Sequence, residues 1–208
     1  MKERKLILHL CADIGSDSRY YQIDDNYDVV MVGEEWGVEN FRVNTGRKVH
    51  GIIANPVCTE FSTVKTHGTN DLEKGMFLVN HCMRIIEETN PVWWVLENPA
   101  TGKLRDILGK PNHIYQPWEY GQPWTKKTAL WGNFNMPKPL FSKWEDVPKR
   151  EGLYIRPGRG KPSLVVFHKS AIDMMPEYRW CRSRIKTDAD IRSLCSDGFA
   201  REFKKINE

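Results

Sequence analysis

Two short apolar runs with a helical stretch between them do most to limit the fold of this chain. Residues 49–54 and 92–96 have the length and the branched or aromatic side chains of buried strands. Between them, the pattern Asn70-x-x-Glu73 predicts the start of a helix. Its apolar face is predicted to contain Leu72, Met76, Val79, Met83 and Ile86. Strand, helix and strand in this order form the right-handed crossover unit of a parallel sheet, so the sequence predicts an α/β fold.

Each predicted strand ends in a proline-containing turn that carries a reactive side chain. The first run is followed by a Pro-Val-Cys turn that ends at Cys58, and the second leads into Glu97. Ligands of open α/β sheets bind in the crevice beyond the carboxyl ends of the strands. A lone cysteine is most often an inert buried residue, and a glutamate at a strand end is often only a turn partner. Because the two occur in one unit, we interpret Cys58 and Glu97 as a functional pair.

The turns resemble two motifs of the cytosine C5-methyltransferase family, which read Pro-Pro-Cys-Gln-x-Phe-Ser and Glu-Asn-Val. Here residues 56–62 read Pro-Val-Cys-Thr-Glu-Phe-Ser, and residues 97–99 read Glu-Asn-Pro. Residues 8–16, Leu-His-Leu-Cys-Ala-Asp-Ile-Gly-Ser, are similar to the family's cofactor loop, Leu-Asp-Leu-Phe-Ala-Gly-Ile-Gly-Gly. Residues 120–128, Tyr-Gly-Gln-Pro-Trp-Thr-Lys-Lys-Thr, are similar to Tyr-Gly-x-Pro-Gln-x-Arg-x-Arg. All four motifs occur in the family's order within residues 6–134.

The resemblance implies a Rossmann-like, S-adenosylmethionine-dependent methyltransferase fold with a mostly parallel central sheet, and methylation of cytosine C5 in DNA. In that chemistry a thiolate, here Cys58, adds to C6 of cytosine and converts the ring to an enamine. An acid at N3 and the exocyclic amine relieves the developing charge, which assigns Glu97 and requires a partly raised pKa. Lys126 stands in place of the first arginine of its motif and completes the predicted catalytic set. No metal is expected, since the histidines and cysteines show no ligand spacing.

The cofactor S-adenosylmethionine is expected at the ends of the first strands. Asp13 replaces the first glycine of the family's loop, and a side chain there either crowds the donor or contacts it. Glu34 or Glu35 follows the second predicted strand, where a carboxylate commonly binds ribose hydroxyls; the alternative is a solvated acidic turn. The residues assigned to the cofactor are Cys11, Asp13, Ile14, Gly15, Glu34, Glu35, Trp36, Asn55 and Pro56.

The substrate is assigned to four further residues: Ser62, Asn98, Pro99 and Trp124. Trp124 replaces the glutamine of the family's motif, and either stacks on a nucleobase or packs in the core. Trp93 and Trp94 are candidates for the apolar surroundings of Glu97. Strand alternation sends them to opposite faces, so only one of them lines the pocket.

The length of 208 residues suits one domain. Residues 1–134 are predicted to form the catalytic core, 135–186 a small basic insertion and 187–208 a helical segment that packs on the core. The insertion interleaves basic and aromatic residues, which suits contact with nucleic acid, although such a surface is often only solubilising. Within it, residues 164–167 are predicted to form a strand. The final helical region is predicted to open at Asp188 and to be interrupted at Gly198.

The five scattered cysteines argue against a disulfide framework and indicate a reducing cytoplasm, and neither a secretory signal nor a membrane span is expected. The short recognition region predicts a phage-like family member, active in the cytoplasm of a bacterial host. One alternative is the same chemistry on a free cytidine nucleotide or RNA, or with a modified donor. Another is a catalytically silent homologue that binds nucleic acid or a partner protein. Retention of Cys58 and Glu97 argues against the silent homologue.

Overall fold

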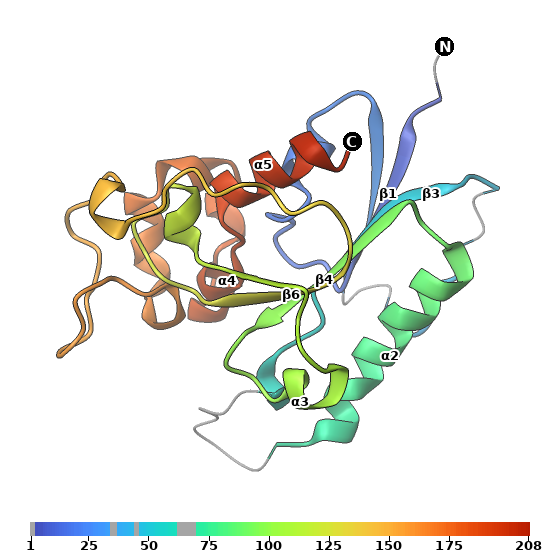
Figure 1. The fold of residues 1–208 in the computed structure, drawn as a ribbon, viewed down its shortest axis with the longest axis horizontal. Helices are drawn as coiled ribbons and strands as arrows, with labels where there is room; N and C mark the ends of the chain where they lie inside the picture. The colour runs from blue at the N-terminus through green and yellow to red at the C-terminus, as the bar shows by residue number, and fades with distance from the viewer. Residues whose placement is uncertain (1–2, 34–36, 44–45, 62–69) are drawn as a thin grey trace.

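The computed structural model describes residues 3–33, 37–43, 46–61 and 70–208, and its centre is a six-stranded sheet in the order β2-β1-β3-β4-β6-β5 (Figure 1). The strands are β1 (Lys5–Leu10), β2 (Tyr27–Val32), β3 (Val49–Ala54), β4 (Trp93–Pro99), β5 (His113–Tyr115) and β6 (Thr128–Asn133). Strands β2, β1, β3 and β4 are mutually parallel, and β6 is antiparallel to both of its neighbours. The predicted α/β class, Rossmann-like with a mostly parallel sheet, is therefore confirmed.

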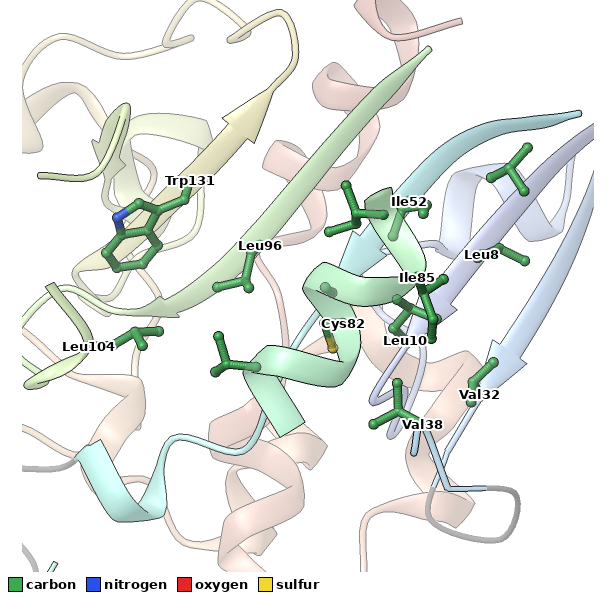
Figure 2. Close-up of a cluster of buried hydrophobic side chains, with 14 of the residues drawn as sticks. Leu8, Leu10, Val32, Val38, Ile52, Cys82, Ile85, Leu96, Leu104 and Trp131 are labelled. Carbon is green, nitrogen blue, oxygen red and sulfur yellow. The ribbon is translucent and has the colours of Figure 1, made fainter. Parts of the chain in front are cut away.

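Helices cover both faces of the sheet. They are α1 (Arg19–Gln22), α2 (Leu72–Thr89), α3 (Leu104–Leu108), α4 (Asp188–Ser193) and α5 (Asp197–Ile206), supplemented by several 3₁₀ turns. Residues facing α2 alternate along the strands with residues facing α5, as expected for strands that are buried on both sides. Figure 2 shows the α2 side, where Cys82 and Ile85 lie over Leu8, Leu10 and Ile52. No helix in the described ranges is long and apolar enough to cross a membrane.

Helix α2 begins one residue later than predicted. Asp71, not Asn70, is the N-cap, because its side chain accepts a hydrogen bond of 2.9 Å from the Lys74 amide. Val79 and Ile86 are buried as predicted, but Leu72 is 39% exposed. The buried face of the helix consists of Gly75, Val79, Cys82, Ile85 and Ile86. The helical pattern did not identify Gly75, because glycine is required there by a contact with a distant residue. A Cβ at this position would come within 2.9 Å of the Phe61 ring.

Helix α5 closes the other face of the sheet through Phe199, Ala200 and Phe203. The prediction that Gly198 interrupts the closing helical region is wrong, because the break falls between α4 and α5 and Gly198 lies in the first turn of α5. A Cβ at Gly198 would stand 2.0 Å from the Tyr120 carbonyl oxygen. Glycine is therefore needed here for the close approach of two backbones.

Gly198→Ala is expected to destabilise the protein by about 1–3 kcal/mol, as overpacking does in a tightly packed interior. Gly160→Ala is the matched control, since nothing lies within 4 Å of a Cβ at that position. Guanidinium-induced unfolding of both variants measures the difference. Equal midpoints for the two variants would contradict the close contact between α5 and Tyr120.

A third core lies under residues 150–194, drawn in orange tones on the left of Figure 1, away from α2. The predicted strand at 164–167 is wrong: Leu164–Val166 form a 3₁₀ turn in which Leu164 and Phe167 are buried and Val165 is exposed. That three-residue spacing suits a 3₁₀ turn and not an alternating strand. Residues Ile191 and Leu194, in and just after α4, belong to this third core, as do Ile14 of the loop after β1 and Trp124. Through Ile14, the segment is thus attached to the loop at the carboxyl end of β1.

Candidate active site

The strand order reverses between β1 and β3, because the chain passes from β1 outward to β2 and returns on the other side of β1. Ligands of open α/β sheets bind at such a switch point, beyond the carboxyl ends of the strands. The loops that border it are residues 11–18 after β1 and residues 55–58 after β3. Glu97, near the end of β4, lies on the next strand along. The predicted catalytic and cofactor segments therefore share one edge of the sheet.

The Cys58 turn is held by its backbone. Cys58 is exposed and precedes a 3₁₀ turn, Thr59–Phe61, in which the Phe61 amide donates to the Cys58 carbonyl at 3.0 Å. Phe61 is fully buried and anchors the turn. From β4, the Asn98 side chain donates to the carbonyl of Pro56 at 2.9 Å. Asn98, assigned to the substrate from sequence, is itself buried and acts in the structure as a brace for this turn.

Glu97 and Lys126 form the charged centre of the site. The Lys126 Nζ lies 4.0 Å from Glu97 Oε1, and the two side chains are only 11% and 17% exposed. The same ammonium donates to the carbonyls of Ser193 and Leu194 at 3.2 and 3.3 Å, so the α4–α5 connection fixes its position. Desolvation opposes the charge of Lys126, but the nearby carboxylates, Glu97 first, raise its pKa. Lys126 is therefore a charged hydrogen-bond donor beside Glu97, and its position is fixed by two backbone carbonyls.

Asn55 links Glu97 to the loop after β1. Its Nδ2 donates to Glu97 Oε2 at 3.3 Å and to Asp17 Oδ1 at 3.2 Å. Its Oδ1 lies 2.8 Å from Nε2 of the fully buried His9, whose Nδ1 lies 2.8 Å from Ser18 Oγ. Because the Asn55 oxygen can only accept, we assign the His9 proton facing it to Nε2. His9, which replaces the acidic residue of the family's motif, thus orients the Asn55 amide.

The pKa of Glu97 is raised, in the direction that its predicted role requires. Burial is the main cause and the charge of Asp17 adds to it, whereas Lys126 and the Asn55 hydrogen bond lower it. Neither Trp93 nor Trp94 borders the small cavity behind Glu97. Its lining is Asp17, Ile53, Val95, Glu97, Tyr115, Leu130, Cys195, Phe199, Ala200 and Phe203. With a volume of about 20 Å³, it has room for roughly one water and none for a nucleobase.

The pKa of Cys58 responds to the same charges. Although the residue as a whole is exposed, protein atoms around its thiol desolvate the thiolate, and this effect and the charge of Glu97 raise the pKa of Cys58. Lys126 acts in the opposite direction. The structure therefore brings all three predicted catalytic residues into one electrostatic unit. A negative charge on Glu97 opposes formation of the Cys58 thiolate.

The loop after β1 has the backbone expected of a close-fitting cofactor loop. Gly15 has φ +80°, and a Cβ there would come within 2.7 Å of Met31. Cys11 has φ +52°, and its sulfur lies 3.7 Å from that of Cys82 in α2. Asp13 is exposed, and one of its carboxylate oxygens accepts a hydrogen bond from the Ile14 amide at 2.5 Å. The side chain therefore does not block the interior of the loop.

The residues of this loop fit S-adenosylmethionine by charge. The sulfonium and the ammonium of that donor are positive, and Asp13 and Asp17 present carboxylates at the switch point. Ile14 and Pro56, also assigned to the cofactor, are buried. Four assigned residues, Glu34, Glu35, Trp36 and Ser62, lie outside the described residues.

Trp124 does not make the predicted contact with the substrate. It is fully buried in the third core, with its ring centre 6.0 Å from that of Phe167 and 6.4 Å from that of Tyr178. It therefore packs in the core and cannot stack on a nucleobase in this conformation. Pro99 remains at the end of β4, opposite Thr128 of β6. Asp17 is the site residue that the sequence did not reveal, since no motif spacing connects it with Glu97.

Comparisons with known proteins give one relative in sequence. No model of a known protein family matches the chain. A "Probable DNA (cytosine-5)-methyltransferase" of Frog virus 3 (isolate Goorha) is 28% identical over 125 residues, which cover 50% of this chain and 56% of the viral protein. The chain thus spans little more than half the length of this relative. A crystal structure titled "putative DNA modification methyltransferase encoded within prophage" (E. coli) is 16% identical, with a TM-score of 0.44, and the match covers 62% of this chain and 46% of the other.

Proposed function

We propose that this chain, a relative of the DNA cytosine C5-methyltransferases, transfers a methyl group from S-adenosylmethionine to C5 of cytosine in DNA, with Cys58 as the nucleophile. The observation that carries the proposal is the grouping of Cys58, Glu97 and Lys126 at the carboxyl edge of the sheet. A thiol, a carboxyl with a raised pKa and a fixed ammonium are the groups that this reaction needs.

The thiolate of Cys58 adds to C6 of the cytosine ring, and the electron pair moves toward N3 and C5. Glu97 in its acid form donates its proton to N3, and its other oxygen accepts a hydrogen bond from the exocyclic amine. S-adenosylmethionine, when bound at the loop after β1, supplies the methyl group. Loss of the C5 proton to a base then breaks the bond between Cys58 and C6. The thiolate is regenerated, and N3 returns its proton to Glu97.

The acid form of Glu97 and the thiolate form of Cys58 favour each other. Because the charge of Glu97 raises the pKa of Cys58, a proton on Glu97 favours the Cys58 thiolate. The same proton is the one that N3 requires. The ammonium of Lys126 lowers the pKa of Cys58 and thereby stabilises its thiolate. The form that reacts with cytosine is therefore thiolate at Cys58 and carboxylic acid at Glu97.

Intact-protein mass spectrometry tests this function. The protein is incubated with S-adenosylmethionine and 5-fluorocytosine placed in duplex DNA, in single-stranded DNA or in the free nucleotide. Fluorine at C5 cannot leave as a proton does, so a covalent adduct on Cys58 that carries the methyl group is expected with DNA. An adduct formed only with the nucleotide would show that the nucleotide, and not DNA, is the substrate. Absence of any adduct would overturn the proposal.

Contact with the DNA backbone is supported by a cluster of Arg19, Trp180 and Arg184, which we name the arginine stack. The two guanidinium carbons lie 4.6 and 5.0 Å from the centre of the Trp180 ring. Arg184 also donates to the Ile14 carbonyl at 3.1 Å, which puts the stack beside the loop after β1. Within the described chain, neither arginine forms an ion pair with an acidic residue. Two gathered positive charges that form no ion pair with a described carboxylate favour an anionic ligand such as phosphate.

Replacing Arg19 and Arg184 with glutamine together is expected to weaken DNA binding and to lower the slope of log affinity against log salt by about two, or about one for each phosphate that is no longer neutralised. Arg182→Gln is the matched control, because its guanidinium already pairs with Asp173 at 2.5 Å. Fluorescence anisotropy across a salt series measures both. Equal slopes for the double variant and the control would remove the arginine stack from the interface.

A further inference from the structure

The buried charges of the site do not balance. Asp17, Glu97 and Lys126 interact with one another, so that two carboxyl groups face one ammonium. Both carboxyl groups accept from the single Asn55 Nδ2, at 3.2 and 3.3 Å, and both line the same small cavity. Two carboxylates this close, with apolar neighbours such as Val95 and Leu130, repel each other strongly. One proton would bring the trio to neutrality.

The other groups facing Glu97 do not supply a second positive charge. Asp13, from the loop after β1, is a further acid. Cys58 follows β3, Tyr115 lies on β5 and Cys195 lies between α4 and α5; ionisation of any of them would add negative charge. Burial holds the pKa of the Tyr115 hydroxyl and of the Cys195 thiol well above their usual values, so both stay neutral at ordinary pH. A proton on one of the two carboxyl groups would supply the missing positive charge.

The two carboxyl groups differ in what surrounds them. Asp17 accepts from Asn55 and, at 3.4 Å, from the Ser16 hydroxyl. Glu97 accepts from Asn55, and its ammonium partner stands at the limit of an ion pair, 4.0 Å away. Burial raises the pKa of Glu97, with Asp17 adding to it. Glu97 is accordingly the member of the pair that takes the proton.

We propose that Asp17 is a positioning residue whose carboxylate, joined to Glu97 through the Asn55 amide, holds a proton on Glu97. The pair is a property of the free protein, and its role in catalysis rests on the proposed function. Asp17 itself does not touch the reacting ring. It keeps Glu97 in the acid form that donates to N3, and at the same time removes a negative charge from beside the Cys58 thiolate.

The test is a ¹³C NMR titration of glutamate side-chain carboxyls in the substrate-free full chain, with the Glu97 signal assigned by its loss in Glu97→Gln. In Asp17→Asn, which keeps the shape and an oxygen acceptor for Asn55, the Glu97 midpoint is expected to move to lower pH. Asp25→Asn is the matched control: it removes one charge at a fully exposed residue in the turn before β2. A Glu97 midpoint in Asp17→Asn that is unchanged, raised, or moved no further than in Asp25→Asn overturns the proposal.

Two further measurements separate the possible failures. Asp17→Ser removes the charge with a smaller side chain, so the titration can be repeated if Asp17→Asn fails to fold. Where methyl transfer is observed, the alkaline limb of its pH profile should move to lower pH in Asp17→Asn, because Glu97 loses its proton earlier. A lowered Glu97 midpoint in a protein that forms no adduct with cytosine would retain the carboxyl pair and reject the proposed function.

Discussion

Cys58→Ser is expected to reduce methyl transfer by at least about 1,000-fold, because the serine hydroxyl is a far weaker nucleophile toward C6 than a thiolate. The substitution should leave the fold intact, since Cys58 is exposed and the contacts that hold its turn come from backbone groups and from Asn98. Transfer of a labelled methyl group to DNA and trapping by 5-fluorocytosine measure the loss.

The neighbouring Val57→Ala serves as the control, because Val57 is 50% exposed in the same turn and has no role in the chemistry. It should retain activity and the covalent adduct. Cys58→Ser should lose methyl transfer and the covalent adduct but retain DNA affinity and its unfolding midpoint. Full activity in Cys58→Ser would reject covalent catalysis through this residue and leave the site to a different mechanism.

Glu97→Gln is expected to lower turnover by about 100- to 10,000-fold, the range found when a general acid is removed. Glutamine keeps the shape of the side chain and one acceptor oxygen for Asn55, but it cannot deliver a proton to N3. The pKa of Glu97 is raised in the native protein, and its acid form is the one that the proposed reaction uses. The rate should therefore fall as pH rises through that value, and this limb should be absent in Glu97→Gln.

A second measurement on Glu97→Gln, the rate of Cys58 alkylation, is expected to rise where the rate of methyl transfer falls. The charge of ionised Glu97 raises the pKa of Cys58, so its removal should lower that pKa and speed alkylation of Cys58 by iodoacetamide at a pH above the Glu97 pKa, where the native side chain is ionised. Unfolding would also speed alkylation of Cys58, because desolvation raises the pKa of its thiol in the folded protein, so an unchanged unfolding midpoint in Glu97→Gln is required to assign the faster alkylation to the lost charge. Glu73→Gln, at an exposed position in the first turn of α2, is the control and should alter neither rate. Slower alkylation in Glu97→Gln would contradict the electrostatic coupling of the two residues.

The sequence predicted the features that depend on local pattern. The apolar runs before Cys58 and at Trp93 identified two parallel strands, and the capping pattern between them identified the start of α2 to within a residue. The carboxyl ends of parallel strands meet at one edge of a sheet, so Cys58 and Glu97 could be expected at the same crevice. Lys126 was found through its motif. These predictions needed only periodicity, chain direction and the chemistry of single side chains.

Other predictions failed where a residue's surroundings come from distant segments. Trp124 reads equally well as a stacking platform or as a core residue, and only contacts with Phe167 and Tyr178, both far along the chain, decide that it is buried. The apolar run at 164–167 has the composition of a strand but no strand partner, and it packs as a 3₁₀ turn under the third core. In both cases long-range packing outweighed local preference.

The sequence by itself determined the α/β sheet, the edge that holds the candidate site and the thiol and carboxyl placed there, because strand and helix periodicity are local properties of the chain. Only the tertiary structure decided which groups set the protonation of that edge. Asp17, Asn55, Glu97 and Lys126 come from four separate segments, and their hydrogen bonds and charges act over a few ångströms. Such distances exist only after the strands have paired and α5 has closed the sheet.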